Sequence, residues 1–300
     1  MRIGIVGFGV MGRNHFRVLK SIPSATIGAI VEPTLEEGEF KGVMVFDSIE
    51  KMSKNASLDA LIIAVPTPLH ESVSLKAIEL GYHLLIEKPI SQTSESGRKI
   101  EAAAKAKGVK CAIGHVERFN PVVQTLKNEL KDKEIYSISI TRVGPFPPRM
   151  ANVGVLTDLS VHDLDLVRFV STREFKDMRI FKSQKIHNHS EDNAEISFLL
   201  DNDIVGNITT NWLTPFKRRR IEVSCKEAFY EADLISQELM EYSQYQKNNS
   251  YLTRWCFVQK GEPLRRELKA FIEFINNGED GHLATLEDSI KTLDILERYA

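Results

Sequence analysis

The pattern of hydrophobic positions changes near residue 118 of this chain. Before that point, short continuous apolar runs alternate with segments of helical periodicity. Continuous apolar strands are typical of a parallel sheet that helices cover on both faces. We therefore predict a doubly wound α/β domain over residues 1–118. The strand-length runs are Ile3–Val6, Thr26–Val31, Val43–Phe46, Ala60–Val65, His83–Ile86 and Lys110–Ile113.

The remainder, residues 119–300, is predicted to be an α+β domain with a mainly antiparallel, open-faced sheet. After Asn120-Pro121, helical and strand patterns follow each other without regular alternation, and from about residue 178 to 235 apolar and polar residues alternate in strand fashion. The other predicted elements are a helix over 122–130, a strand over 135–143, an amphipathic helix over about 155–170, and two closing helices near 262–276 and 286–298.

Two threonines in the first part are candidate helix caps. Thr67 stands before a helix pattern that runs to Gly81, and Thr93 stands before one that ends at Gly108. A threonine hydroxyl can accept a hydrogen bond at a helix N-terminus, and glycine commonly follows a helix C-terminus.

The segment Gly7-Phe8-Gly9-Val10-Met11-Gly12 directly follows the first apolar run and precedes a helix pattern that ends at Pro23. In such a loop the three glycines allow a tight turn, close approach of a pyrophosphate, and close packing of helix on strand. The strand before the loop and the helix after it make the pattern more specific than its glycines alone. A plain strand–helix turn is the alternative.

Glu32 ends the second apolar run, 20 residues after Gly12. A carboxylate here accepts hydrogen bonds from the ribose hydroxyls of NAD and repels the 2′-phosphate of NADP. Residues 33–37 contain no lysine or arginine that would bind that phosphate. The sequence therefore predicts NAD rather than NADP, with a solvent-facing Glu32 as the alternative.

Further candidate residues follow later strands, where ligands bind in open α/β sheets. Pro66, Thr67 and His70 come after the fourth run, and Glu87-Lys88-Pro89 ends the fifth. Because Pro89 restricts the backbone before it, Lys88 has little freedom to move. Its ammonium group could bind a substrate hydroxyl and stabilise alkoxide character. The alternative is an exposed lysine paired with Glu87.

A second set of polar residues lies on the predicted helix near 155–170. Asp158, His162 and Asp165 are spaced by four and three residues, which places them on one helical face. A histidine beside carboxylates can accept a proton near neutral pH. A solvated polar stripe and a metal site are the alternatives. We expect no metal, since the sequence shows no other cluster of ligand residues.

Composition and charge narrow the class of protein. The 300 residues are 42% hydrophobic and 27% charged, with a formal net charge of −2. This balance gives no general attraction to nucleic acid or anionic membranes. Three widely spaced cysteines, short apolar runs and no signal-peptide pattern lead us to expect a cytoplasmic protein without disulfides.

Taken together, the glycine loop, Glu87-Lys88-Pro89 and the Asp158/His162 pair resemble the glucose–fructose oxidoreductase/inositol dehydrogenase (Gfo/Idh/MocA) family. The resemblance extends over nearly the whole chain, and residues 154–165 resemble the family's second-domain signature. It implies that Lys88, Asp158 and His162 flank the nicotinamide and a sugar or polyol carbinol. It also implies a homodimer or homotetramer that assembles through the second-domain sheet.

Within the family, residues 114–121 are similar to the UDP-N-acetylglucosamine 3-dehydrogenase type. A nucleotide-sugar substrate would suit basic side chains such as Arg149. The run Lys217-Arg218-Arg219-Arg220 is read as a solvated hairpin between strands, with an anion site as the alternative.

The sequence thus predicts an NAD-dependent dehydrogenase that oxidises a secondary hydroxyl of a nucleotide sugar. A free-sugar or inositol dehydrogenase and a non-catalytic NAD-binding sensor are the alternatives. The expected substrate contacts come from Lys88, Arg118, Asn120, Arg149, Asp158 and His162.

Overall fold

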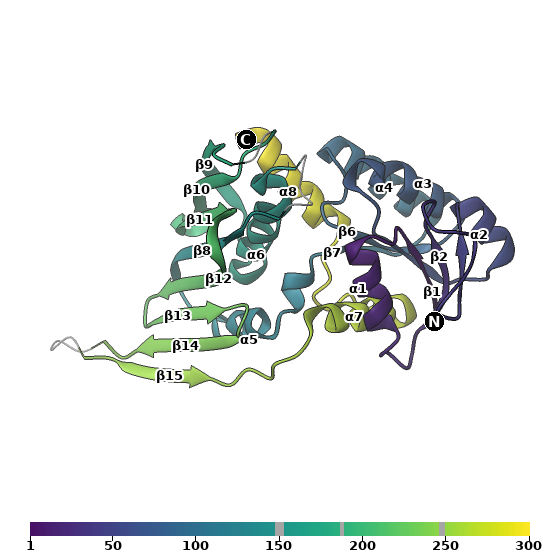
Figure 1. The fold of residues 1–300 in the computed structure, drawn as a ribbon. Helices are drawn as coiled ribbons and strands as arrows, with labels where there is room; N and C mark the ends of the chain where they lie inside the picture. Colours follow the sequence, from purple (N-terminus) through teal and green to yellow (C-terminus); the bar gives the residue numbers. More distant parts are fainter. Residues whose placement is uncertain (148–152, 187–188, 246–249) are drawn as a thin grey trace. The chain divides into compact units, whose positions relative to one another are not determined.

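The computed structural model describes residues 1–147, 153–186, 189–245 and 250–300 (Figure 1). The chain divides into two compact units. The first comprises Met1–Val116 and Glu262–Asp294, and the second comprises Glu117–Gly261 and Ile295–Ala300. The expected boundary near residue 118 lies two residues from this division. Residues 262–294, however, lie in the first unit, whereas the sequence analysis assigned them to the second domain.

The first unit contains a mostly parallel sheet with strand order β3-β4-β2-β1-β5-β6-β7. Every strand pair in it is parallel except β3 with β4. The strand order reverses beside β1, which pairs with both β2 and β5. The strands are β1 (Arg2–Val6), β2 (Thr26–Val31), β3 (Gly38–Phe40), β4 (Val43–Phe46), β5 (Ala60–Ile63), β6 (His83–Glu87) and β7 (Cys111–Gly114).

Helices cover both faces of this sheet, which confirms the predicted doubly wound arrangement. Leu61 and Ile63 on β5 belong to the core that α2, α3 and α4 cover. The helices α1 and α7 lie together on the other face (Figure 1). The helices of this unit are α1 (Val10–Leu19), α2 (Ile49–Asn55), α3 (His70–Glu79), α4 (Ser94–Lys107), α7 (Pro263–Asn277) and the larger part of α8 (Leu286–Tyr299).

Long-range contacts explain why residues 262–294 belong to the first unit. Lys110 Nζ donates hydrogen bonds to the carbonyls of Phe274 and Ile275, at 2.9 and 2.8 Å, and so binds the C-terminal end of α7. The Ile113 N–H donates to the carbonyl of Ala284 at 2.9 Å. Such partners cannot be read from local periodicity.

The second unit contains a mainly antiparallel sheet with strand order β15-β14-β13-β12-β8-β11-β10-β9. Among the described residues of this unit, the one parallel strand pair is β8 with β11. This confirms the predicted sheet type. The strands are β8 (Ile135–Pro145), β9 (Phe175–Ser183), β10 (Asn193–Leu200), β11 (Val205–Asn211), β12 (Leu213–Cys225), β13 (Ala228–Asp233), β14 (Glu238–Ser243) and β15 (Leu252–Cys256).

Two helices, α5 (Pro121–Glu129) and α6 (Val161–Ser171), pack against the apolar side of this sheet. Ile138 and Ile140 on β8 and Leu164 and Val167 on α6 share one core, and all four are fully buried. Alternation along the strands therefore reflects one face packed on helices.

Local predictions have mixed outcomes. Thr93 accepts a hydrogen bond from the Ser96 N–H at 3.2 Å, and α4 stops at Gly108, whose φ is +71°, as predicted. Thr67 does not cap α3: it begins the short 3₁₀ helix η1 (Thr67–Leu69), and α3 has no side-chain cap. The 217–220 run lies inside β12 and is not a hairpin, because β12 continues through it to Cys225.

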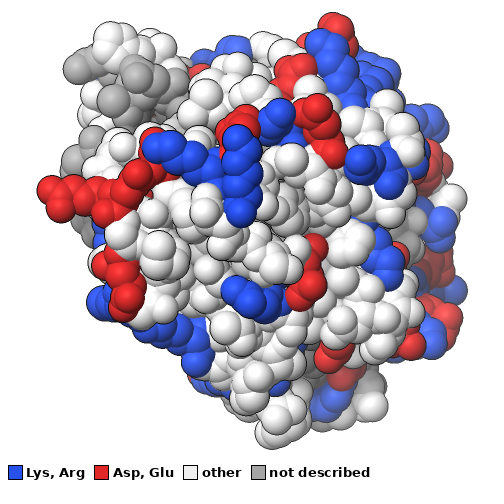
Figure 2. Space-filling view, turned by 90° about the vertical axis from the view of Figure 1, so that its right-hand side faces the viewer, with Lys and Arg blue, Asp and Glu red and all other residues white. Residues whose placement is uncertain are grey.

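Charges of both signs are interspersed on the face shown in Figure 2. Among the described residues, no helix is long and apolar enough to cross a membrane. The three cysteines are free thiols.

Candidate active site

The glycine loop joins β1 to α1 in a conformation that requires glycine at two positions. Gly7 has φ of +91°, and a Cβ there would lie 2.5 Å from the carbonyl oxygen of Ala64. A Cβ on Gly12 would lie 2.0 Å from the carbonyl oxygen of Gly7. Gly7 and Gly12 therefore allow the turn and the close packing of α1, as the spacing predicts.

Gly9 differs from the other two because a Cβ on it would meet no described atom within 4 Å. Gly9 is exposed and stands just before α1, whose first turn contains no acidic side chain. Open space in front of a helix N-terminus fits a pyrophosphate. The open space at Gly9 and the positive end of the α1 helix dipole therefore both suit the pyrophosphate of NAD.

Glu32 is bound directly to this loop. The Phe8 N–H donates to Glu32 Oε2 at 2.8 Å, and the Thr34 hydroxyl donates to Oε1 at 2.8 Å. Burial by itself would raise the pKa of Glu32, but these hydrogen bonds and the charge of Arg13 lower it overall. Glu32 is therefore an ionised acceptor beside the loop.

The side chain of Phe8 is buried and contacts Phe16 and Phe40 edge to face. Beside these rings is a cavity of about 380 Å³ whose other lining residues are cationic: Arg13, Arg17, Lys20 and Lys41. The sequence analysis did not identify this basic and aromatic group, because its members are spread over residues 8–41. Val10 is half exposed at the start of α1.

His70 is buried, with 1% of its surface exposed, although the sequence placed it among the cofactor contacts. Its Nε2 lies 2.9 Å from the carbonyl oxygen of Val65, and its Nδ1 lies 2.8 Å from that of Pro89. Burial lowers the pKa of His70. The imidazole thus links the loops after β5 and β6. Pro66 is exposed just before η1, and Thr67, the first residue of η1, is partly exposed.

Lys88 follows β6 and is partly exposed, between the buried residues Glu87 and Pro89. A Glu87–Lys88 pair is the alternative to a functional Lys88. The Glu87 carboxylate contacts His15, with 2.6 Å between Oε1 and Nε2. Lys88 is thereby placed at the carboxyl edge of the parallel sheet, where α/β folds bind ligands.

Asp158 and His162 lie where a π-helical turn, η3 (Leu156–Ser160), leads into α6. Both side chains are partly exposed. Single π turns often occur at functional sites, since they change the direction of the side chains they carry. The continuous α-helix expected over 155–170 is therefore replaced by two helical types, and the π turn carries Asp158.

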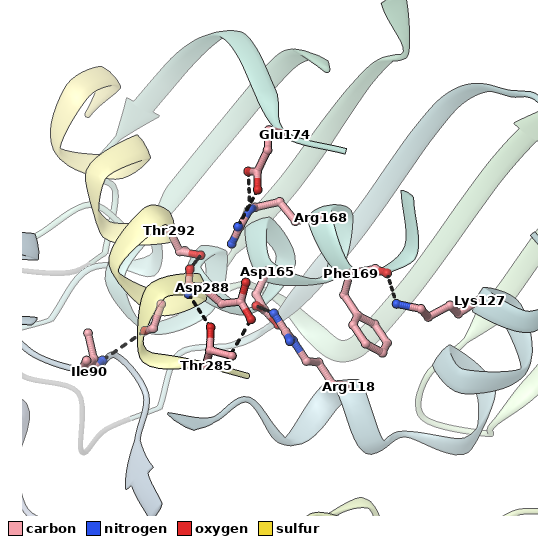
Figure 3. A network of polar contacts seen from close by, with 11 residues as sticks. Ile90, Arg118, Lys127, Asp165, Arg168, Phe169, Glu174, Thr285, Asp288 and Thr292 are labelled. Atoms are coloured by element: carbon pink, nitrogen blue, oxygen red, sulfur yellow. Dashed lines mark hydrogen bonds and ion pairs between the residues drawn. The ribbon is translucent and has the colours of Figure 1, made fainter. Parts of the chain in front are cut away.

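Asp165, which the sequence grouped with that pair, is buried and binds Arg118 (Figure 3). Arg118 donates from Nε to Asp165 Oδ2 at 2.8 Å and from Nη2 to Oδ1 at 2.5 Å. Asn120 is also buried, accepts from the Val122 N–H and donates to the carbonyl of Leu234. Arg118 and Asn120 are predicted substrate contacts. In the structure, Arg118 binds α6, and Asn120 connects the start of α5 to Leu234, both within the second unit. Arg149 lies outside the described residues.

An ionic group around the buried Arg142 joins β8, β12, α6 and the segment just before α5, and the local sequence does not predict it. Arg142 Nε donates to both oxygens of Asp163, at 2.8 and 3.0 Å, and its Nη1 donates to Glu117 at 3.1 Å. Arg219 also donates to Glu117, at 3.0 Å. Burial opposes the charge on Arg142, yet the two carboxylates raise the pKa of Arg142 overall. The group fixes α6 at the residue after His162.

The remaining polar clusters of the second unit are largely paired. Arg220 forms an ion pair with Glu231 at 2.8 Å, so the 217–220 run engages carboxylates through Arg219 and Arg220. Glu129, Glu241 and Cys256 form a group of metal-ligand type among the described residues. Arg254 binds both of these glutamates. The sequence pattern did not reveal this group.

Comparison with known proteins agrees with this arrangement. The model of the oxidoreductase family with an NAD-binding Rossmann fold, GFO_IDH_MocA, matches residues 1–115, and the model of the GFO/IDH/MocA C-terminal domain matches residues 134–231. The first unit is accordingly an NAD-binding Rossmann domain.

Relatives with assigned activities include two dehydrogenases. The UDP-N-acetylglucosamine 3-dehydrogenase of Acidithiobacillus ferrooxidans is 28% identical over 81% of this chain and 77% of that protein. The scyllo-inositol 2-dehydrogenase (NAD(+)) of Bacillus subtilis is 25% identical over 72% of this chain and 68% of that protein.

A solved structure of the UDP-N-acetylglucosamine 3-dehydrogenase from A. ferrooxidans has the same fold. It aligns with a TM-score of 0.89 at 23% identity, over 99% of this chain and 96% of that one. The match of both family models, in order and over both units, shows that this chain belongs to the Gfo/Idh/MocA family of oxidoreductases.

Proposed function

We propose that this protein is an NAD-dependent dehydrogenase that oxidises a secondary hydroxyl of a nucleotide sugar, with UDP-N-acetylglucosamine as the first substrate to test. The observation that carries the proposal is the presence, in one chain, of a dinucleotide loop with Glu32, a lysine at the sheet edge, and the Asp158/His162 pair. The relative from A. ferrooxidans supports the choice of sugar.

The residues fit the cofactor in shape and charge. Gly9 leaves room for a pyrophosphate at the N-terminus of α1, and Glu32 offers carboxylate oxygens to the ribose hydroxyls. When bound, NAD would accept a hydride, and with it two electrons, from the carbinol carbon of the substrate.

The protein side chains then handle the hydroxyl group. Lys88 donates a hydrogen bond to the carbinol oxygen and stabilises its developing negative charge. His162 accepts the hydroxyl proton, and Asp158 orients the imidazole. An NAD-binding sensor without turnover would need none of these three residues.

The test is a screen for NADH formation with UDP-sugars, free sugars and inositols. We expect turnover with a UDP-sugar and a loss of about 10²–10⁴-fold in kcat for Lys88→Ala or His162→Ala. Lys99→Ala, on an exposed face of α4, is the control. Turnover with inositol alone would show that the proposed nucleotide-sugar substrate is wrong. A fully active Lys88→Ala would contradict the mechanism.

Self-association through the eight-stranded sheet is part of this proposal. Phe181 on β9, Val205 on β11 and Trp255 on β15 are exposed by 65%, 54% and 66%. We expect these apolar side chains to be covered when two copies of the sheet associate. Light scattering coupled to size exclusion should give a dimer or tetramer, and Phe181→Glu should reduce its mass.

A further inference from the structure

Lys88 lies between two residues that are each held by a buried histidine. On one side, His15 Nε2 lies 2.6 Å from Glu87 Oε1. On the other side, His70 Nδ1 lies 2.8 Å from the carbonyl oxygen of Pro89. His15 is 0% exposed and His70 is 1% exposed. The two histidines come from different helices, α1 and α3.

The contact between His15 and Glu87 joins the proposed cofactor-binding part of the first unit to the part that carries Lys88. His15 is on the helix that begins at the glycine loop, and Glu87 is the last residue of the strand that precedes Lys88. Buried pairs of this kind are poor stabilisers, since apolar residues of similar volume often serve as well. Stability alone therefore does not account for this pair.

The Glu87 carboxylate has a closely defined position. A Cβ on Gly114, in the neighbouring strand β7, would lie 3.3 Å from the Glu87 carboxylate carbon and from Oε2. Helix α7 adds Glu267, which is fully buried and whose pKa is raised well above 4.5 by burial and by the charge of Glu87. From α1, His15 is the residue that forms a hydrogen bond with the Glu87 carboxylate.

His70 acts on the backbone beyond Lys88. A neutral imidazole donates from one nitrogen only, and an imidazolium donates from both. The neutral ring of His70 therefore holds one of the two carbonyls, of Val65 or Pro89, and the charged ring holds both. In either case the ring packs between the loops that follow β5 and β6.

We propose that His15 and His70 are positioning residues for Lys88, which they serve by fixing Glu87 and Pro89 on its two sides. The inference rests on the proposed function, in which Lys88 donates to the substrate oxygen. Neither histidine needs to touch substrate or cofactor. Their effect on turnover passes through the position of the Lys88 ammonium group.

The first experiment reads the environment of Lys88 directly. Lysines of the full chain are reductively methylated with ¹³C-formaldehyde, and Lys88→Arg identifies the Lys88 resonance by its loss. We expect His15→Leu and His70→Leu to shift or broaden that resonance, and His15→Gln, which keeps a donor, to restore it. His83→Leu is the matched control, because His83 accepts from the Lys110 N–H at the opposite end of β6.

The second experiment is a double-mutant cycle on turnover. We expect His15→Leu to lower kcat by about 10–100-fold at unchanged KM for NAD. In a Lys88→Ala background the same substitution should cause no further loss. A merely structural histidine would lower kcat by the same factor in both backgrounds.

Either of two results would overturn the proposal: a Lys88 resonance that is unchanged in His15→Leu and His70→Leu, or equal kcat losses in both backgrounds. If His15→Leu does not fold, the double variant His15→Leu/Glu87→Leu replaces it, since it leaves no unpaired Glu87 charge. A fully active Lys88→Ala would reject the proposed function, whereas the resonance would still test the positioning role.

Discussion

The backbone N–H of Phe8 donates to Oε2 of Glu32 across 2.8 Å, which ties the glycine loop to the end of β2. This contact holds the carboxylate beside the loop that precedes α1. In the proposed cofactor site, Glu32 presents an ionised acceptor at the place where NAD and NADP differ. Arg13 and Lys41 line the neighbouring cavity and would attract a 2′-phosphate, so we expect the Glu32 carboxylate to be the group that opposes NADP.

We expect Glu32→Ala to weaken NAD binding and to strengthen NADP binding. A hydrogen bond to a charged group contributes about 1.5–3 kcal/mol, so NAD affinity should fall about 10–100-fold. NADP gains because the repulsion of its 2′-phosphate is removed. Titration calorimetry with both nucleotides measures the two changes. Glu36→Ala removes the same charge from the exposed loop and should alter neither affinity.

The parallel sheet could be predicted from sequence because its strands are continuous apolar runs. Strand β3 was missed, since Gly38–Phe40 is short and contains a single apolar residue. The place of α7 was also missed. Its amphipathic pattern predicts a buried face, but the contacts of Lys110 with Phe274 and Ile275 decide which unit that face packs on.

Local sequence predicts the backbone geometry of the glycine loop better than it predicts buried polar pairs. Gly7 and Gly12 follow from their spacing. His15 lies four residues after Met11 and four before Leu19, in line with the apolar positions of α1, which indicates a buried histidine. Its partner Glu87, however, is 72 residues away. Arg142 sits at a position of β8 that faces the core, and only the fold brings Asp163 and Glu117 to it.

The glycine loop allows a paired prediction. A Cβ on Gly12 would meet the backbone oxygen of Gly7 at 2.0 Å, whereas one on Gly9 would meet no described atom within 4 Å. Gly12→Ala should therefore destabilise the first unit by about 1–3 kcal/mol. Gly9→Ala should change stability by less than about 0.5 kcal/mol.

NAD binding should separate the two variants in a different way from stability, because Gly9→Ala should lose NAD affinity without losing stability. Gly9→Ala keeps the fold but places a methyl group where the pyrophosphate approaches, so its NAD affinity should fall at least about tenfold. Thermal melting by circular dichroism and NAD titration separate the two effects. Normal NAD binding by Gly9→Ala would show that the pyrophosphate does not use this loop.

The buried ionic group of the second unit should be sensitive to loss of its arginine. Arg142→Met leaves Asp163 without its two hydrogen bonds and Glu117 with Arg219 alone among its arginines. Breaking one side of a buried pair costs about 3–5 kcal/mol.

Tryptophan fluorescence during urea unfolding can measure this loss, because Trp212 and Trp255 both lie in the second unit and the chain has two tryptophans. Lys226→Ala breaks an exposed pair with Glu134 and should cost less than about 1 kcal/mol. Equal urea midpoints for Arg142→Met and Lys226→Ala would contradict the prediction that the ion pairs of Arg142 are needed for the stability of the second unit.

The buried carboxyl group of Glu267 should make the first unit less stable as pH rises. Burial, with the nearby charge of Glu87, raises the pKa of Glu267 well above 4.5 in the folded chain. Above pH 4.5 the unfolded chain therefore holds fewer protons at this residue than the folded chain does. Stability is lost by up to about 1.4 kcal/mol per pH unit until the folded pKa is passed.

Glu267→Gln removes this titration while keeping the shape of the side chain. Its stability relative to wild type should be smallest near pH 4 and should increase toward pH 8. Hydrogen exchange of β1, β5 and β6 peptides, compared at the two pH values, reports on this unit alone. Glu273→Gln, on the exposed face of the same helix, should show no such trend. A constant difference across this range would mean that Glu267 is already ionised in the folded protein.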